Sequence, residues 1–155
     1  MDFIILTDSR QQKEAHILKT FDKQNIIHIR TGLPSADYMA LRYNGGFKLD
    51  YSILIDTKKD LEEISGNLCN TQNHERIKRE IEKAKELGCK DFIFLIGDNK
   101  INTTQDLLNW TSKRTKVTGN VLYKIMKTMT AKYGVRFIIC KKNMMGEKII
   151  KLLGG

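Results

Sequence analysis

The chain has 155 residues, of which 41% are hydrophobic and 29% charged, so it can bury the core of one domain and is not a disordered segment. Its formal net charge is +9, which favours a polyanionic partner such as nucleic acid, although many basic proteins are merely soluble. No apolar run approaches the roughly 20 residues of a membrane span, and Asp2 stands where a signal peptide is positive, so we expect an intracellular, cytoplasmic protein with no membrane contact.

The first part of the chain predicts four strands and one helix. Short apolar or alternating runs predict the strands, at residues 3–6, 26–29, 37–43 and 47–57. The last two strands flank Asn44-Gly45-Gly46, a turn signal that predicts a β-hairpin. Residues 14–21 predict a helix, because Ala15, Leu18 and Phe21 recur at helical spacing.

The rest of the chain alternates helices and strands. Helical patterns occupy residues 59–68, 75–87, 121–129 and 147–153, and a helical turn is expected at 106–110 inside the polar segment 98–117. Strands are predicted at 92–96 and 135–140. This order indicates an α/β domain in which helices flank a mixed sheet that contains one hairpin.

Two acids and a lysine stand at the open ends of the predicted hairpin arms. Asp37 begins the first arm, and Asp56 and Lys58 close the second. Side chains alternate along a strand, so Asp56 and Lys58 point the same way, roughly 6.6 Å apart, and the pairing can bring Asp37 next to Asp56. Two carboxylates and the carbonyl of Thr57 form a hard oxygen site of the kind that Mg²⁺ takes. Lys58 would then hold the attacking water or neutralise charge at phosphorus.

A structural role is the alternative for these residues. Asp-x-Lys triplets are common, and both acids can serve as solvated groups at strand ends. The context favours a site, because Asp56 and Lys58 close an apolar run and ionisable groups at that edge need partners or a cation.

Several short motifs follow one another in a recognisable order: Thr7-Asp8-Ser9-Arg10-Gln11, Ser35-Ala36-Asp37-Tyr38, Ile55-Asp56-Thr57-Lys58, Leu61, and Ser65-Gly66-Asn67-Leu68. Together they resemble the nuclease domain of XPF-type structure-specific endonucleases, within the PD-(D/E)XK, restriction-endonuclease-like superfamily. The similarity runs over nearly the whole chain. It implies a three-layer restriction-endonuclease-like fold, and one nuclease domain over residues 1–155 without the helix-hairpin-helix module that usually follows.

The resemblance also implies roles for individual residues. Asp37 and Asp56 would be catalytic metal ligands, Lys58 the catalytic lysine and Asp8 a further acid at the metal. Arg10 would contact DNA or organise the site. The cofactor would be Mg²⁺, for which Mn²⁺ substitutes. The enzyme would hydrolyse phosphodiester bonds in branched or junction DNA during recombination, repair or phage DNA processing, because short stand-alone domains of this type look like those of bacteriophages and mobile elements.

Arg76 and Glu80 fall where the family carries its last motif pair. They are four residues apart on a predicted helix, so a simple ion pair and a role at the site are both open. Arg76 is a candidate DNA contact, and Glu80 a candidate support for the site.

Departures from the family pattern support a second hypothesis. Gln11 stands in place of a glutamate, Thr57 in place of an arginine and Ala36 in place of a glycine. The chain is therefore either a metal-dependent endonuclease or a catalytically weak or inactive DNA-binding scaffold that keeps the nuclease fold.

The basic charge is concentrated near the end of the sequence. Residues 111–155 hold eleven basic side chains and one acid, whereas residues 1–110 hold sixteen basic and seventeen acidic ones. Lys113, Arg114 and Lys116, here called the basic loop cluster, are predicted to grip the DNA backbone. Trp110 beside them either covers the core, the role we favour, or stacks on a base. Met126 and Met129 belong to the core or to a helix contact of a homodimer.

Overall fold

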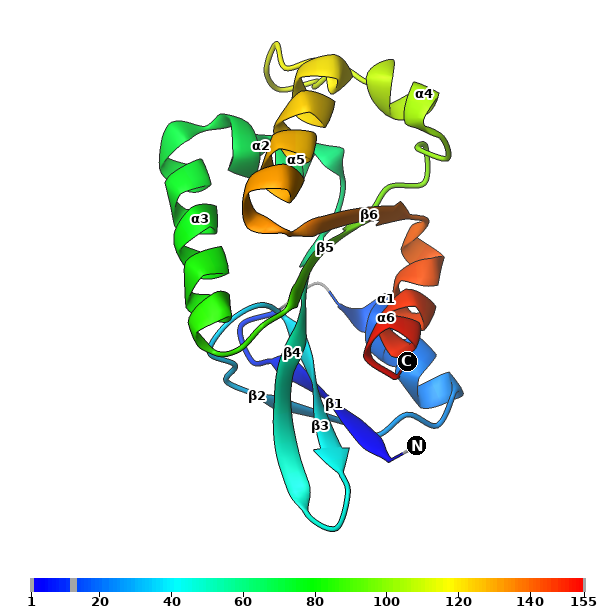
Figure 1. Cartoon of the computed structure of the whole chain (residues 1–155). Helices are drawn as coiled ribbons and strands as arrows, with labels where there is room; N and C mark the ends of the chain where they lie inside the picture. The colour runs from blue at the N-terminus through cyan, green and yellow to red at the C-terminus, as the bar shows by residue number, and fades with distance from the viewer. Residues whose placement is uncertain (1, 12–13, 155) are drawn as a thin grey trace.

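The computed structural model describes residues 2–11 and 14–154, and its centre is one twisted six-stranded sheet (Figure 1). The strands are β1 (Phe3–Asp8), β2 (His28–Thr31), β3 (Tyr38–Tyr43), β4 (Phe47–Lys58), β5 (Asp91–Gly97) and β6 (Arg136–Cys140). They lie in the order β2-β1-β3-β4-β5-β6. Strand β3 runs antiparallel to β1 and β4, and all other neighbouring pairs are parallel, so the predicted mixed sheet with one hairpin is confirmed.

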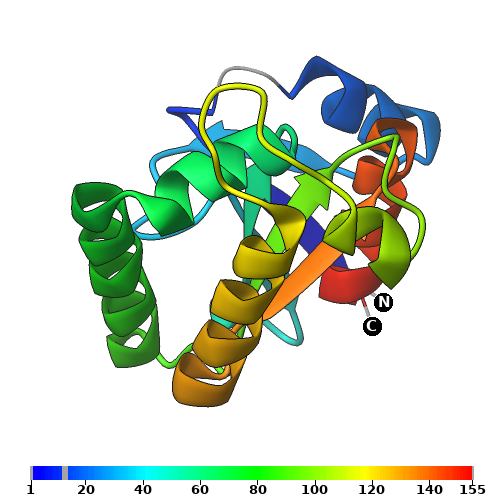
Figure 2. The same ribbon diagram turned by 90° about the horizontal axis from the view of Figure 1, so that it is seen from above.

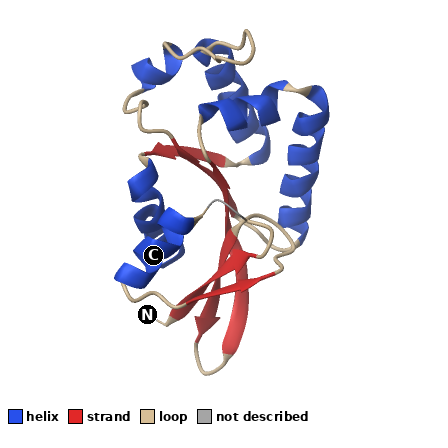
Figure 3. Ribbon diagram, turned by 180° about the vertical axis from the view of Figure 1, so that it is seen from behind, coloured by secondary structure: helices blue, strands red, loops and turns tan. Residues whose placement is uncertain are grey.

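Helices cover both faces of the sheet, which confirms the three-layer α/β fold (Figure 3). One face carries α1 (Ala15–Lys23) and α6 (Met145–Gly154), which follows the 3₁₀ turn η1 (Lys142–Met144). The other carries α2 (Leu61–Cys69), α3 (Thr71–Glu86), α4 (Thr104–Leu108) and α5 (Gly119–Tyr133). Because strand side chains alternate between faces, Ile55 packs under α1 and α6 whereas Leu54 packs under α2 and α3.

An irregularity in the hairpin places the start of β3 beside the end of β4. Tyr38 pairs with Ile55 but Ala40 pairs with Asp50, so β4 has extra residues against β3 at this point. The carboxylate of Asp50 stabilises the irregularity by accepting hydrogen bonds from the backbone and hydroxyl of Ser52, at 3.0 and 2.5 Å. Beyond it, the Asp37 N–H donates to the carbonyl of Ile55 at 2.9 Å, which fixes Asp37 next to Asp56.

Several expected elements differ in detail from the structure. Helix α1 buries Phe21 as predicted, but it buries Ile17 in place of Ala15, which is exposed, and Leu18 is half-buried. Strand β2 begins two residues later than predicted, since the Ile26 N–H closes the end of α1 on the carbonyl of Phe21 at 2.8 Å. Helix α3 begins four residues earlier than predicted.

The early start of α3 has a local cause. The side chain of Asn70 caps the helix by accepting a hydrogen bond from the Asn73 N–H at 3.1 Å. Met126 and Met129 of α5 are buried in the core, which is the first of the two roles left open for them. Within the described residues no helix is both long and apolar enough to cross a bilayer.

Candidate active site

The structure brings Asp37, Asp56 and Lys58 together at the end of β4. The oxygen Oδ2 of Asp37 accepts hydrogen bonds from the backbone N–H and the hydroxyl of Thr57, at 2.8 and 2.9 Å. The Lys58 ammonium lies 3.1 Å from Oδ2 of Asp56, so these two side chains share a face as the strand alternation predicts. The three charged groups are thus held by adjacent backbone segments of one hairpin.

The site contains more negative charge than its partners neutralise. Burial and the neighbouring Asp56 carboxylate raise the pKa of Asp37 to about 8, and the hydrogen bonds from Thr57 only partly oppose this. Oδ2 of Asp56 is buried and accepts no hydrogen bond, although the Lys58 ammonium lies 3.1 Å from it as an ion-pair partner. Burial disfavours the charged form of Lys58, but the Asp56 carboxylate outweighs it and the pKa of Lys58 is raised. Lys58 is therefore a cation and a donor at neutral pH.

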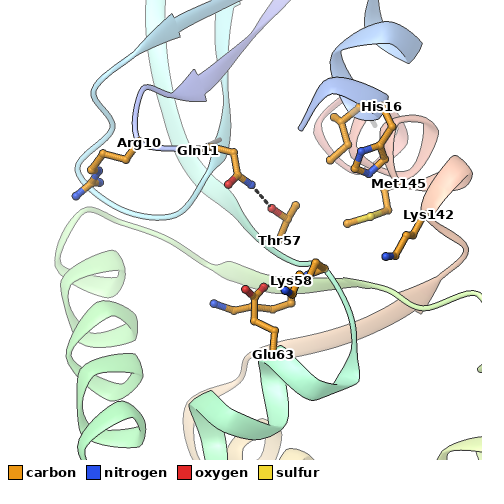
Figure 4. Close-up of a pocket in the computed structure, with 10 residues that line it drawn as sticks. Arg10, Gln11, His16, Thr57, Lys58, Glu63, Lys142 and Met145 are labelled. Carbon is orange, nitrogen blue, oxygen red and sulfur yellow. Dashed lines mark hydrogen bonds between the residues drawn. The ribbon is translucent and has the colours of Figure 1, made fainter. Parts of the chain in front are cut away.

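Gln11 completes the arrangement around Asp37. Its side-chain amide donates to the hydroxyl of Thr57 at 2.6 Å and lies 3.5 Å from Oδ2 of Asp37 (Figure 4). The Thr57 hydroxyl in turn donates to Asp37. Gln11 and Thr57, two of the three residues that depart from the family pattern, therefore form a neutral network that orients Asp37. The sequence marked both positions but gave no signal that they bond to each other.

Asp8 holds Arg10 at the edge of the site. Its two carboxylate oxygens accept hydrogen bonds from Nε of Arg10 at 2.9 Å and from the N–H of Leu33 at 3.0 Å. The guanidinium of Arg10 also donates to the carbonyl of Leu33 at 3.2 Å, yet 74% of the Arg10 side chain is exposed. Oδ2 of Asp8 thus holds Arg10 and Oδ1 holds the Leu33 backbone, and each oxygen keeps a further lone pair, so the metal-ligand role of Asp8 stays a prediction.

A pocket of about 480 Å³ opens at the end of β4, where Thr57 and Lys58 line it (Figure 4). Arg10, Gln11, Thr57 and Lys58 line one part of it. Further lining residues that the sequence analysis missed come from four other segments: His16 and Ile17, Lys59, Glu63, and Lys142 and Met145. Lys59 and Glu63 follow β4 directly in the sequence, whereas only the packing of α1, η1 and α6 on the sheet brings His16, Ile17, Lys142 and Met145 to the end of β4.

Glu80 belongs to the electrostatics of the site. It is half-buried, and burial and the Asp56 carboxylate raise its pKa. Among the described residues Glu80 forms no close ion pair with Arg76, whose side chain is exposed. The structure therefore places Glu80 near the site and does not pair it closely with Arg76.

The basic loop cluster lies on an exposed loop that is attached to α2. Glu62, in the first turn of α2, accepts hydrogen bonds from the hydroxyl of Ser112 at 2.7 Å and from the Lys113 N–H at 2.5 Å. The loop therefore passes over the helix that directly follows β4 (Figure 2). Trp110 packs against the core, which confirms the favoured reading of this residue.

The donor set fits a hard divalent cation. Within residues 2–11 and 14–154 no group of three His, Cys, Asp or Glu side chains could enclose a metal, and the site itself has the carboxylates of Asp37 and Asp56. The raised pKa of Asp37 shows that the two buried carboxylates repel each other, and a cation between them would relieve that repulsion. Asp37, Asp56 and the carbonyl of Thr57 are the groups that would hold the ion, and water would fill the remaining positions.

Comparison with known proteins places the chain in a family. The model of the ERCC4 domain matches residues 7–153. Among solved structures, XPF from Aeropyrum pernix superposes with a TM-score of 0.65 at 14% identity, covering 97% of this chain and 63% of that one. XPF from Aeropyrum pernix in complex with DNA gives 0.70 at 16% identity, covering 99% and 64%.

The likeness to these two structures is one of fold, and the chain spans less than two thirds of their length. No curated protein matches the sequence. The resemblance to the XPF-type nuclease domain is nevertheless confirmed, since the family model covers nearly the whole chain and the six-stranded sheet superposes on that of XPF. The chain belongs to the ERCC4 domain family.

Proposed function

We propose that this protein is a divalent-metal-dependent endonuclease that hydrolyses phosphodiester bonds of DNA. The observation that carries the proposal is the buried pair Asp37 and Asp56, in which the Lys58 ammonium lies 3.1 Å from Asp56 while the pKa of Asp37 stays raised to about 8. Membership of the ERCC4 domain family and the DNA complex of the related XPF structure support it. We further propose that the substrate is branched or junction DNA, met in recombination, repair or phage DNA processing, with Mg²⁺ or Mn²⁺ as the ion.

Each residue of the site has a distinct task in this mechanism. A divalent ion, when bound, would polarise a phosphoryl oxygen of the DNA and lower the pKa of a bound water. Asp37 and Asp56 would hold the ion, and Thr57 and Gln11 fix the orientation of Asp37 through hydrogen bonds of 2.9 Å or shorter. Lys58 is cationic, so it acts as a donor that positions water and stabilises charge developing on phosphate, and not as a base.

Exposed basic side chains from several segments would bind the DNA around the carboxylates. Arg10 presents an exposed guanidinium that Asp8 and Leu33 hold in place. The exposed basic loop cluster is attached to α2 through Glu62, and Arg76 is exposed on α3, the helix that carries Glu80. These contacts would meet phosphates, so they supply affinity that depends on salt and not on base sequence.

The test is a panel of labelled DNAs of equal length: single strand, duplex, flap, fork and four-way junction, each with Mg²⁺, Mn²⁺ or EDTA. We expect cleavage of branched forms with either ion and none in EDTA. Lys58→Met should keep DNA binding and lose about 10²- to 10³-fold in the cleavage rate, because it removes a preorganised charge. Lys127→Met, on the exposed face of α5, is the matched control. Cleavage in EDTA, or full activity of Lys58→Met, would contradict the proposal.

One observation favours a second candidate, a DNA-binding scaffold without activity. Gln11 and Thr57 are neutral, and their mutual hydrogen bond of 2.6 Å occupies the position where the family pattern has two charged residues. In this case the wild-type protein would bind the branched DNAs and cut none of them with any divalent ion.

A further inference from the structure

The pocket at the end of β4 extends beyond the residues that the proposed mechanism uses. Figure 4 shows His16, Lys142 and Met145 on the side of Thr57 that faces away from Arg10 and Gln11. Together with Ile17 and Lys59, which also line the pocket, they are here called the His16 arm. Thr57 connects the two parts, because it lines the pocket and also donates two hydrogen bonds to Asp37. A ligand in the arm would therefore lie next to the carboxylates.

Close packing builds the walls of this arm. A side chain on Gly146 would place its Cβ 2.6 Å from Cβ of Thr20, so only glycine lets α6 approach α1 this closely. A Cβ on Gly97 would lie 2.5 Å from the sulfur of Met145, so glycine at the end of β5 leaves room for that side chain. The Lys142 N–H donates to the side-chain oxygen of Asn99 at 2.8 Å, which ties η1 to the loop after β5.

The arm combines an apolar floor with a basic rim. Ile17 and Met145 are buried at the floor, whereas His16, Lys59 and Lys142 are exposed at the rim. Glu63 is the one carboxylate among the residues that line the pocket in the described part of the chain, and it accepts a hydrogen bond from the Lys59 N–H at 3.0 Å.

The imidazole of His16 offers a neutral stacking surface. Burial and the nearby Lys142 lower the pKa of His16, so its ring is neutral at pH 7. A pocket with an apolar floor, an aromatic ring and two ammonium groups suits a base together with its phosphate.

We propose that the His16 arm holds the nucleotide adjacent to the scissile phosphate, with its base unpaired against His16 and Met145 and its phosphate between Lys59 and Lys142. This inference rests on the proposed function and gives it a substrate class. A base that is paired and stacked in a duplex cannot enter the arm without being flipped out, which costs energy, whereas an unpaired base at a branch enters freely. The arm thereby selects DNA in which the nucleotide beside the cut is already unpaired.

The test measures binding in EDTA, so that it does not depend on cleavage. Fluorescence anisotropy compares a flap with an unpaired nucleotide at the branch and a nicked duplex of equal length. We expect His16→Ala and Lys142→Gln to weaken flap binding by roughly 5- to 100-fold and to change duplex binding by less than about twofold. His16→Phe should retain flap binding because it keeps the stacking surface. Lys151→Gln, exposed on α6 outside the arm, is the matched charge control and should leave the flap preference unchanged.

A 2-aminopurine at the unpaired position reports stacking directly. Its emission should fall on binding to the wild type and to His16→Phe, and stay unquenched with His16→Ala. Equal loss of flap and duplex binding, or an unquenched emission with the wild type, would overturn the inference. A flap preference that depends on His16 in a protein that cuts no DNA would support the arm and refute the nuclease, so the two failures are distinguishable.

Discussion

Replacing one carboxylate should stabilise the metal-free protein at alkaline pH. In Asp37→Asn the amide oxygen can still accept the hydrogen bonds that Thr57 donates at 2.8 and 2.9 Å, but the negative charge is lost. The wild-type group has its pKa raised from 3.8 to about 8 in the folded state. Between these values the folded state holds a proton that the unfolded state has released, so this group's stabilising contribution is present below pH 3.8 and is lost as the pH rises to about 8.

The magnitude follows from the size of the shift. At about 1.4 kcal/mol per unit, a pKa raised from 3.8 to about 8 corresponds to an upper limit of roughly 6 kcal/mol. A stability difference of one third of this limit would separate the melting temperatures of Asp37→Asn and wild type by about 4–8 °C at pH 8, and by much less at pH 4.

Thermal unfolding in EDTA at pH 4, 6 and 8 measures this difference. Mg²⁺ at 100 times its Kd should then stabilise the wild type by about 2.7 kcal/mol at pH 8 and leave Asp37→Asn nearly unaffected. Glu82→Gln, at an exposed position of α3, is the matched control. An Asp37→Asn protein that melts below the wild type at pH 8, or a difference that does not grow with pH, would refute the charge excess at the site.

Two further predictions concern DNA affinity and packing. Changing all three residues of the basic loop cluster to Gln should weaken DNA binding for every sequence and reduce the slope of log K for DNA binding against log salt concentration by up to about 3. An unchanged affinity in a salt titration would refute this DNA surface. Gly119→Ala should lower the free energy of unfolding by about 1–3 kcal/mol or more, because its Cβ would overlap the Leu107 carbonyl. Gly66→Ala, in the exposed and open part of α2, should raise the free energy of unfolding by about 0.5–1 kcal/mol. Urea unfolding of the two variants measures both effects.

Most of the fold was predictable because its signals are local. The turn Asn44-Gly45-Gly46 between alternating runs predicted the hairpin, and apolar runs predicted the central strands β4 and β5. The starts of β2 and α3 were predicted wrongly because each depends on a single hydrogen bond, from Ile26 to the end of α1 and from Asn73 to Asn70. Such bonds leave no periodic pattern in the sequence.

The candidate site likewise has a part that the sequence predicts and a part that it does not. Asp56 and Lys58 were placed on one face by strand alternation, and Asp37 beside them by the hairpin. The bond between Gln11 and Thr57 joins residues 46 positions apart and could not be predicted from spacing. The same is true of the His16 arm, whose walls come from α1, η1 and α6 and meet only in the folded chain.

The measurement that tests the central claim most directly is the initial rate of flap cleavage in Mg²⁺, with the wild type and Asp56→Asn compared at equal occupancy of DNA. Asp56 holds the oxygen that is buried without a hydrogen bond, and the isosteric amide removes its charge with little change in volume. We expect the wild type to cut and the variant to lose at least about 10²-fold in rate while still binding the DNA. Equal rates for the two proteins, or binding without cleavage by the wild type, would contradict an active site built on Asp37 and Asp56.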